Sequence, residues 1–135
     1  MIDIESQVFD AVAKRLKASF PDIVVTGEYV KAPSGFPCVS LIEMDNAQYR
    51  ATQSSSSNEN HASLMYELNV YSNKARRKKS ECKEIAAVVD DVMANLGFTR
   101  TMLNPVPNLN DATIYRIVGR YSAIVSRDEV IFRTR

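Results

Sequence analysis

The chain is poor in the residue types from which most catalytic and metal sites are built. Its 135 residues include one histidine, two cysteines, four glycines and no tryptophan. His61 has no cysteine or paired carboxylate at ligand spacing, so a metal site is not expected, and a catalytic triad would have to rely on this one histidine. The glycines form neither of the glycine-rich patterns that cradle phosphates. The sequence therefore predicts neither an enzyme nor a cofactor-binding protein.

Long apolar runs are also missing. The longest ones are only a few residues long, too short to cross a membrane. The first residues include Asp3 and Glu5 and no apolar signal core, so secretion is not expected. Outside an oxidising compartment, Cys38 and Cys82 are expected to be two buried thiols rather than a disulfide.

The net charge of +1 hides a difference between two parts of the chain. Residues 1–72 carry five Lys/Arg against nine Asp/Glu, whereas residues 73–135 carry twelve against seven. Opposite potentials steer protein surfaces together and fix their alignment. One interpretation is therefore head-to-tail contact between copies of the chain. The alternative is a chance distribution, which is not rare in a small domain.

The spacing of apolar residues predicts two amphipathic helices and a set of strands. Apolar residues recur every four positions from Ile4 to Leu16, which is typical of one face of a helix. Asp3 is expected to cap this helix, and Gly97 stands where a glycine commonly ends the second one. The expected elements are a helix over 4–19, strands over 23–30, 38–50 and 62–71, a helix over 74–96, and strands over 98–103, 113–125 and 130–132.

This order of elements predicts an α+β fold. Its natural form is a mostly antiparallel sheet of about four to five strands, with two helices packed on one face. The length and the 45% share of hydrophobic residues predict one soluble domain over residues 1–135.

The most distinctive expected feature is a long, projecting β-hairpin over residues 38–71. Its two strands are joined by the polar stretch 51–61, ATQSSSSNENH. So long an insert in a small domain is usually functional or without fixed structure, which predicts an arm whose flexible tip docks during assembly. Met65 and Tyr71 alternate with core-facing residues and are expected to be exposed contact residues. The tip residues expected to act in assembly are Ser54, Ser55, Ser56, Ser57, Asn58 and His61.

A basic run follows the hairpin. It consists of Lys74, Arg76, Arg77, Lys78 and Lys79. These cations are expected in the first turns of the second helix, capped by Ser72 or Asn73, where the helix dipole disfavours positive charge. One interpretation is a solvated, frayed helix start, partly relieved by Glu81 and Glu84. The other is an electropositive rim for an acidic protein surface or for nucleic acid, although no helix-turn-helix pattern supports sequence-specific DNA binding.

Three segments carry a resemblance to a known family. They are PCVSLIEMDNAQYR, NENHASLMYELNVYSN and KKSECKEIAAVVDDVMANLGFTRTMLNPVPNLNDATIYRIVGRYSAIV. These segments follow one another as they do in small tail-terminator and head–tail joining proteins of long-tailed bacteriophages and their prophages. The resemblance extends over residues 4–125. The resemblance implies a small α+β fold that assembles as a ring, usually a hexamer, without catalysis. The resemblance implies no active-site residue in this chain.

The function implied by this resemblance is structural. Such a ring would stop growth of the tail tube and present its other face to the connector on the filled head. The implied partners are further copies of the chain, a tail-tube protein, and a neck or head-completion protein. The implied location is the tail or neck of a virion assembled in the bacterial cytoplasm.

Other functions stay open at this point. One is an adjacent neck or head-completion protein. Another is a nucleic-acid-binding accessory protein that uses residues 74–79 near DNA. A small hydrolase is disfavoured because a catalytic set of residues is missing.

Overall fold

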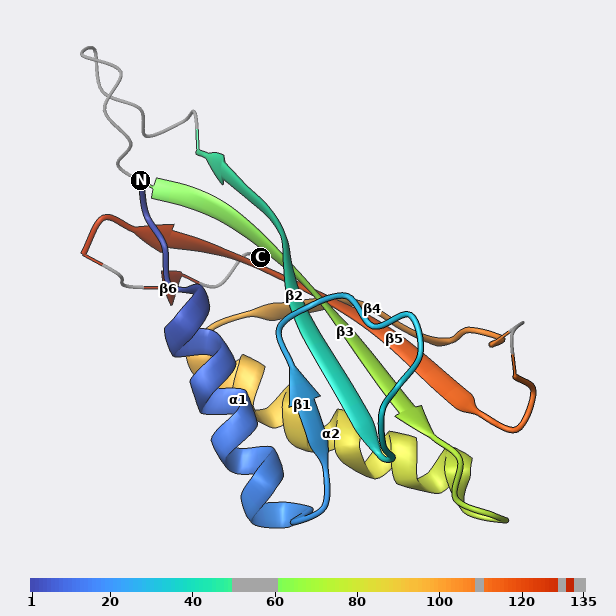
Figure 1. The fold of residues 1–135 in the computed structure, drawn as a ribbon. Helices are drawn as coiled ribbons and strands as arrows, with labels where there is room; N and C mark the ends of the chain where they lie inside the picture. Colours follow the sequence, from blue (N-terminus) through green and yellow to red (C-terminus); the bar gives the residue numbers. More distant parts are fainter. Residues whose placement is uncertain (50–60, 109–110, 129–130, 133–135) are drawn as a thin grey trace.

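The computed structural model describes residues 1–49, 61–108, 111–128 and 131–132. Its elements in chain order are α1 (Glu5–Ser19), β1 (Val24–Thr26), β2 (Cys38–Gln48), β3 (His61–Ser72), α2 (Lys78–Leu96), β4 (Thr99–Pro105), β5 (Tyr115–Ser126) and β6 (Ile131–Phe132). The predicted order of helices and strands is confirmed, and so is the α+β fold (Figure 1).

The strands form one mixed sheet with the order β1-β2-β3-β5-β4, and the short β6 pairs with β5. The pairing of β1 with β2 is parallel, and the other pairs among the described strands are antiparallel. Strand β3 lies inside the sheet, because it pairs with β2 on one side and with β5 on the other, from His61 opposite Ser126 to Ser72 opposite Tyr115.

The predicted hairpin is therefore part of the main sheet over its described length. A strand with neighbours on both sides does not stand away from the domain as an arm. The residues that join β2 to β3, and with them most of the predicted tip, fall within 50–60 and lie outside the described residues.

Both helices cover the same face of the sheet (Figure 1). From α1, the stripe Val8, Val12 and Leu16 is buried. Alternate residues of the strands meet the helices, as a period of two requires. The largest fully buried side chains in this layer include Leu64, Tyr66, Leu68, Ile85, Val89, Met93 and Tyr121. Each buried Val, Leu or Met contributes about 1.5–3 kcal/mol to folding relative to an exposed one.

The first residues of the chain fold back onto the sheet beside β2. Ile2 and Ile4 are buried, and the Asn46 side-chain amide donates a hydrogen bond to Ile2 O over 2.8 Å. Ile4 takes the N-cap position of α1. The prediction that Asp3 occupies this position was wrong, because burial of Ile4 moves the helix start to the next residue. The Asp3 carboxylate instead accepts a hydrogen bond from the Glu5 N–H.

Strand β1 is shorter than the expected strand over residues 23–30. It ends at Thr26, whose hydroxyl accepts a hydrogen bond from the Glu28 N–H over 3.2 Å. Such a side-chain turn competes with continued pairing along a strand. Beyond Ser40, the outer side of β2 therefore has no partner strand in the part of the chain that the structure describes.

The C-terminus of α2 is the one predicted. Gly97 has a φ of 104°, a left-handed conformation that glycine adopts without steric cost. Its N–H donates to Ala94 O and the Phe98 N–H donates to Met93 O, so two carbonyls of the last turn are satisfied. Phe98 is thereby turned into the core, where its ring meets Tyr66 edge to face.

Candidate assembly surface

Residues 74–77 form a turn that precedes α2, so the basic run is not all helical. The Arg77 N–H donates to Lys74 O over 3.1 Å, and Arg76 has a φ of 64°. Only Lys78 and Lys79 of the run lie in the helix, whose N-cap is Arg77. The expected helix start at residue 74 was wrong, and the unfavourable interaction of cations with this end of the helix dipole gives the physical reason.

The expected capping role of Ser72 or Asn73 was wrong as well. The Ser72 hydroxyl is buried at the end of β3, where it accepts a hydrogen bond from the Lys74 N–H and donates one to Glu81 over 2.7 Å. These two bonds fix the turn against the side of α2. They do not satisfy the helix terminus itself, at which no side-chain cap is formed.

Several cations of the run interact within the chain. Lys74 pairs with Glu81 and Arg77 pairs with Glu84. The Lys78 ammonium lies 3.4 to 3.5 Å from backbone carbonyls of the loop before β5. By contrast, Arg76 and Lys79 form no ion pair with any residue that the structure describes. The electropositive surface is therefore smaller than the sequence suggests.

Tyr71 is buried rather than exposed. It retains 5% of its accessible surface, because β3 is an interior strand and the Arg116 guanidinium lies over its ring at 5.5 Å. The expectation that Tyr71 is exposed was wrong for that reason. Met65 lies on the same face of β3 and is half-buried, so part of its side chain is accessible.

Only one of the predicted tip residues lies within the described part of the chain. His61 is the first residue of β3, where it is half-buried opposite Ser126, and its carbonyl accepts a hydrogen bond from the Tyr49 N–H. It therefore belongs to the sheet and not to a flexible tip. The residues Ser54, Ser55, Ser56, Ser57 and Asn58 lie outside the described residues.

A basic groove lies at the β4 edge of the sheet. It has a volume of about 190 Å³ and is lined by Lys79, Lys83, Leu103, Asn104, Pro105, Tyr115 and Ile117. The two lysines come from consecutive turns of α2 and are exposed, while the apolar side chains come from β4 and β5. The groove thus combines an apolar floor with a positively charged wall.

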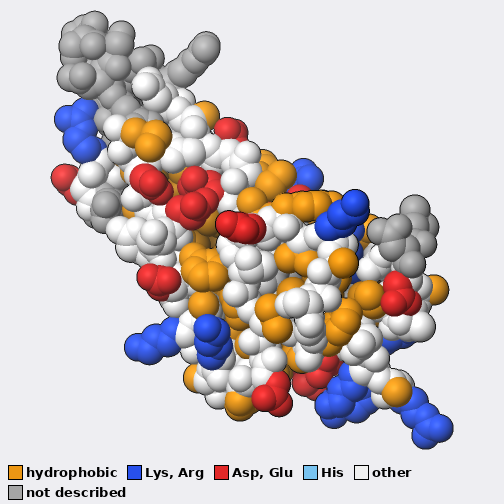
Figure 2. All heavy atoms as spheres, viewed as in Figure 1, with side chains coloured by type: hydrophobic (Ala, Val, Ile, Leu, Met, Phe, Trp, Pro, Cys, Tyr) orange, Lys and Arg blue, Asp and Glu red, His pale blue; other side chains and the backbone are white. Residues whose placement is uncertain are grey.

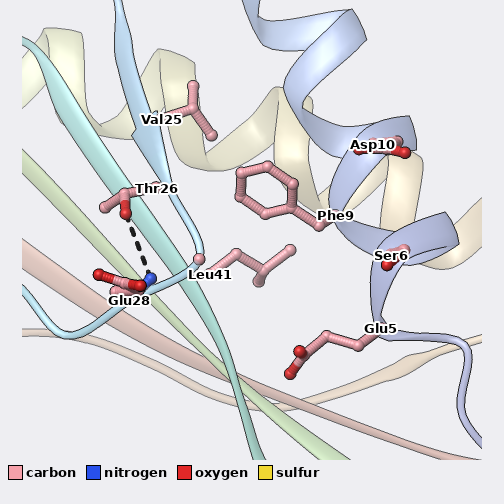
Figure 3. A pocket seen from close by; sticks show the side chains of 9 residues that line it. Glu5, Ser6, Phe9, Asp10, Val25, Thr26, Glu28 and Leu41 are labelled. Carbon is pink, nitrogen blue, oxygen red and sulfur yellow. Dashed lines mark hydrogen bonds between the residues drawn. The ribbon is translucent and has the colours of Figure 1, made fainter.

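An acidic groove lies at the opposite edge, between α1 and β1 (Figure 3). Its volume is about 440 Å³, and Phe9, Val25 and Leu41 supply the apolar part of its lining. Figure 3 shows the side chains of Phe9 and Leu41 directed into the space between the helix and the strands. The remaining lining residues are Glu5, Ser6, Asp10, Thr26, Gly27 and Glu28.

Charged side chains are unevenly distributed over the face seen in Figure 2. Acidic side chains gather over the upper part of β2, and basic side chains gather at the lower right, with further basic side chains at the left and upper left. Sequence reasoning found the charge split but neither groove. The difference in charge between residues 1–72 and 73–135 was the available sign of the grooves in the sequence. Their apolar floors could not be predicted, because these come from elements far apart in the chain.

Within the described residues, groups suited to chemistry are few. No cluster of three or more His, Cys, Asp or Glu side chains is placed to hold a metal ion. The described helices include none with the length and apolar character needed to span a bilayer. Cys38 and Cys82 are buried free thiols, as predicted. Burial raises the pKa of both thiols, that of Cys82 to about 12, so both stay protonated.

Comparison with known proteins finds similarity in fold. No family model and no curated protein matches the chain. The fold is similar to that of a chain in a solved structure described as the virion of a native gene transfer agent particle. The TM-score is 0.67, the sequence identity is 19%, and the likeness covers 91% of this chain and 94% of the other. At this identity the likeness shows a shared fold.

Proposed function

We propose that this chain is a structural protein of a phage-like virion. The observation that carries the proposal is the shared fold with a chain of the gene transfer agent virion, which extends over nearly the full length of both chains. The resemblance of residues 4–125 to phage tail proteins points in the same direction. Two grooves with apolar floors give the domain surfaces suited to contacts with other subunits.

Within the virion, we assign the chain to the head-proximal end of the tail. There it forms a ring, a hexamer by the family resemblance, that ends growth of the tail tube and joins the tail to the head. Its role is non-enzymatic. Its partners are other copies of itself, the tail-tube protein and a neck or head-completion protein. Opposite charge on opposite edges of the sheet supports the ring, because head-to-tail contacts close into rings when the rotation allows.

Native mass spectrometry and negative-stain images of the purified chain test this proposal. The chain is examined alone and with the tail-tube protein, and the expected result is a closed ring that binds the end of the tube. A strict monomer under both conditions contradicts the proposal. A ring that does not bind the tube contradicts the terminator role and favours the role of an adjacent neck protein.

A further inference from the structure

The two grooves occupy matching positions at opposite edges of the sheet. The acidic groove lies between α1 and β1, the first strand of the sheet order, and the basic groove lies between α2 and β4, the last. Residues of α1 and α2 line the two grooves, and these helices cover one face of the sheet (Figure 1), so both grooves lie on that face. Neither β1 nor β4 has a described strand on its outer side. Exposed edges of this kind are normally covered or paired, because they otherwise invite association.

The charges in the two grooves are opposite and are not neutralised by residues that the structure describes. The acidic groove is lined by Glu5, Asp10 and Glu28 and by no described Lys or Arg. The basic groove is lined by Lys79 and Lys83 and by no described Asp or Glu. Over the described residues, the side chains of Asp10, Glu28, Lys79 and Lys83 form no ion pair.

Each groove also offers apolar surface. Leu41 and Ile117 are the buried parts of the two floors, whereas Phe9, Leu103 and Tyr115 are half-buried and keep accessible area. Burial of such area drives association without directing it. Charge complementarity then decides which surfaces meet. A partner that fits both grooves has one acidic and one basic surface, each with an apolar centre, and a second copy of this chain meets that requirement.

We infer that the acidic groove of one copy contacts the basic groove of the next. The inference rests on the proposed function and names the contact by which the ring closes. Because the grooves lie on opposite edges of one sheet, the contact is head-to-tail. A linear row of copies therefore has one unoccupied acidic groove at one end and one unoccupied basic groove at the other. Repetition of a single rotation then closes the assembly when a whole number of copies completes a full turn.

Two charge-reversal variants test the contact. The first carries Lys79→Glu and Lys83→Glu, which makes both grooves acidic. The second carries Asp10→Lys and Glu28→Lys, which makes both grooves basic apart from Glu5. Glu5 is left unchanged because an acidic residue in the first turn stabilises α1. All four substituted residues are exposed, so the fold should survive, as circular dichroism and thermal melting verify.

Each variant alone is expected to stay monomeric, with a dissociation constant raised by roughly 100-fold, because attraction between the grooves becomes repulsion. Mixed in equal amounts, the two variants should form rings again, since each groove then meets one of opposite charge. These rings should contain both variants in alternation and an even number of copies. A control that reverses Lys14 and Lys17, exposed cations of α1 that line neither groove, should assemble as the wild type does.

The outcomes separate this inference from the proposed function. If the wild type forms rings and the variants form them equally well, the groove contact is wrong while the ring stands. Variants that form rings but no longer bind the tail-tube protein also contradict the contact between grooves, because the grooves then bind the tail tube and not a second copy. A wild-type chain that never forms a ring, alone or with the tube, contradicts the ring and the contact together.

Discussion

Ser40 and Asn69 lie opposite each other on β2 and β3 and are both buried, yet only Asn69 has its polar side-chain atoms satisfied. Its carbonyl oxygen accepts two hydrogen bonds from Arg116, over 3.0 and 2.6 Å, and its amide donates to Glu67. The Ser40 hydroxyl has no partner in the part of the chain that the structure describes. Two neighbouring buried polar residues therefore affect stability in opposite directions.

Alanine substitution should distinguish these two positions. Ser40→Ala removes an unsatisfied hydroxyl, so stability should be unchanged or higher by up to about 1 kcal/mol. Asn69→Ala leaves the Arg116 guanidinium without its acceptor, and the expected loss is about 1–3 kcal/mol. Urea unfolding of both variants measures the difference. Equal losses would show that Ser40 has a partner comparable to those of Asn69.

Glu43 gives the fold a pH dependence. Burial raises the pKa of its carboxyl, the nearby Glu5, Asp3 and Asp45 raise it further, and the hydrogen bond from Tyr66 opposes them. A carboxyl with a raised folded-state pKa binds more protons in the folded than in the unfolded state. Its contribution to stability is therefore lost as pH rises from the usual glutamate range, about 4, through the folded pKa.

Glu43→Gln should accordingly stabilise the protein more at pH 7 than at pH 4.5, relative to the wild type. The amide keeps an acceptor for the Tyr66 hydroxyl and removes the charge that burial disfavours. Unfolding free energies at the two pH values provide the test. A change of equal size at both would mean that ionisation of Glu43 has no part in stability.

Gly97 ends α2 in a conformation that other residues adopt at a cost. Gly97→Ala should lower stability by about 1–2 kcal/mol, because a side chain in the left-handed region is strained. Gly97→Asn is the matched variant and should cost less, since asparagine tolerates this conformation better. Thermal denaturation of the two variants checks the order. Identical melting temperatures would argue against strain as the cause.

The hypothesis of nucleic-acid binding makes a separate prediction. If residues 74–79 held a phosphate backbone, replacing Arg76 and Arg77 by alanine would reduce the slope of log affinity against log salt by about 2. Because Arg77 already pairs with Glu84 and the proposed role needs no DNA contact, we expect weak DNA binding and an unchanged slope. Fluorescence anisotropy with duplex DNA over a salt series measures both quantities. A reduced slope would favour the accessory-protein alternative.

Local patterns in the sequence predicted much of the fold. The stripe from Val8 to Leu16, the alternation in β3 and the glycine at position 97 each follow from the periodicity or the end geometry of one element. Periodicity also identified which residues of β3 share a face. It could not show that the second face is covered near Tyr71, because the covering side chain, Arg116, comes from another strand.

The candidate surface was less predictable because it depends on tertiary arrangement. The hydrogen bonds of Ser72 with Lys74 and Glu81 compete with the cap that was expected at the start of α2. The acidic groove brings Phe9, Glu28 and Leu41 together from three separate segments. Counting charged residues showed that residues 1–72 and 73–135 differ in net charge. Only the sheet order shows that the acidic and basic grooves lie at opposite edges of the sheet.

The position of the chain in an assembled particle tests the central claim most directly. Electron microscopy of purified particles that carry an epitope-tagged chain and a gold-labelled antibody would show this position. The proposed function predicts label as a ring at the junction of head and tail. Label along the tail tube, on the capsid shell, or absent from purified particles would contradict it.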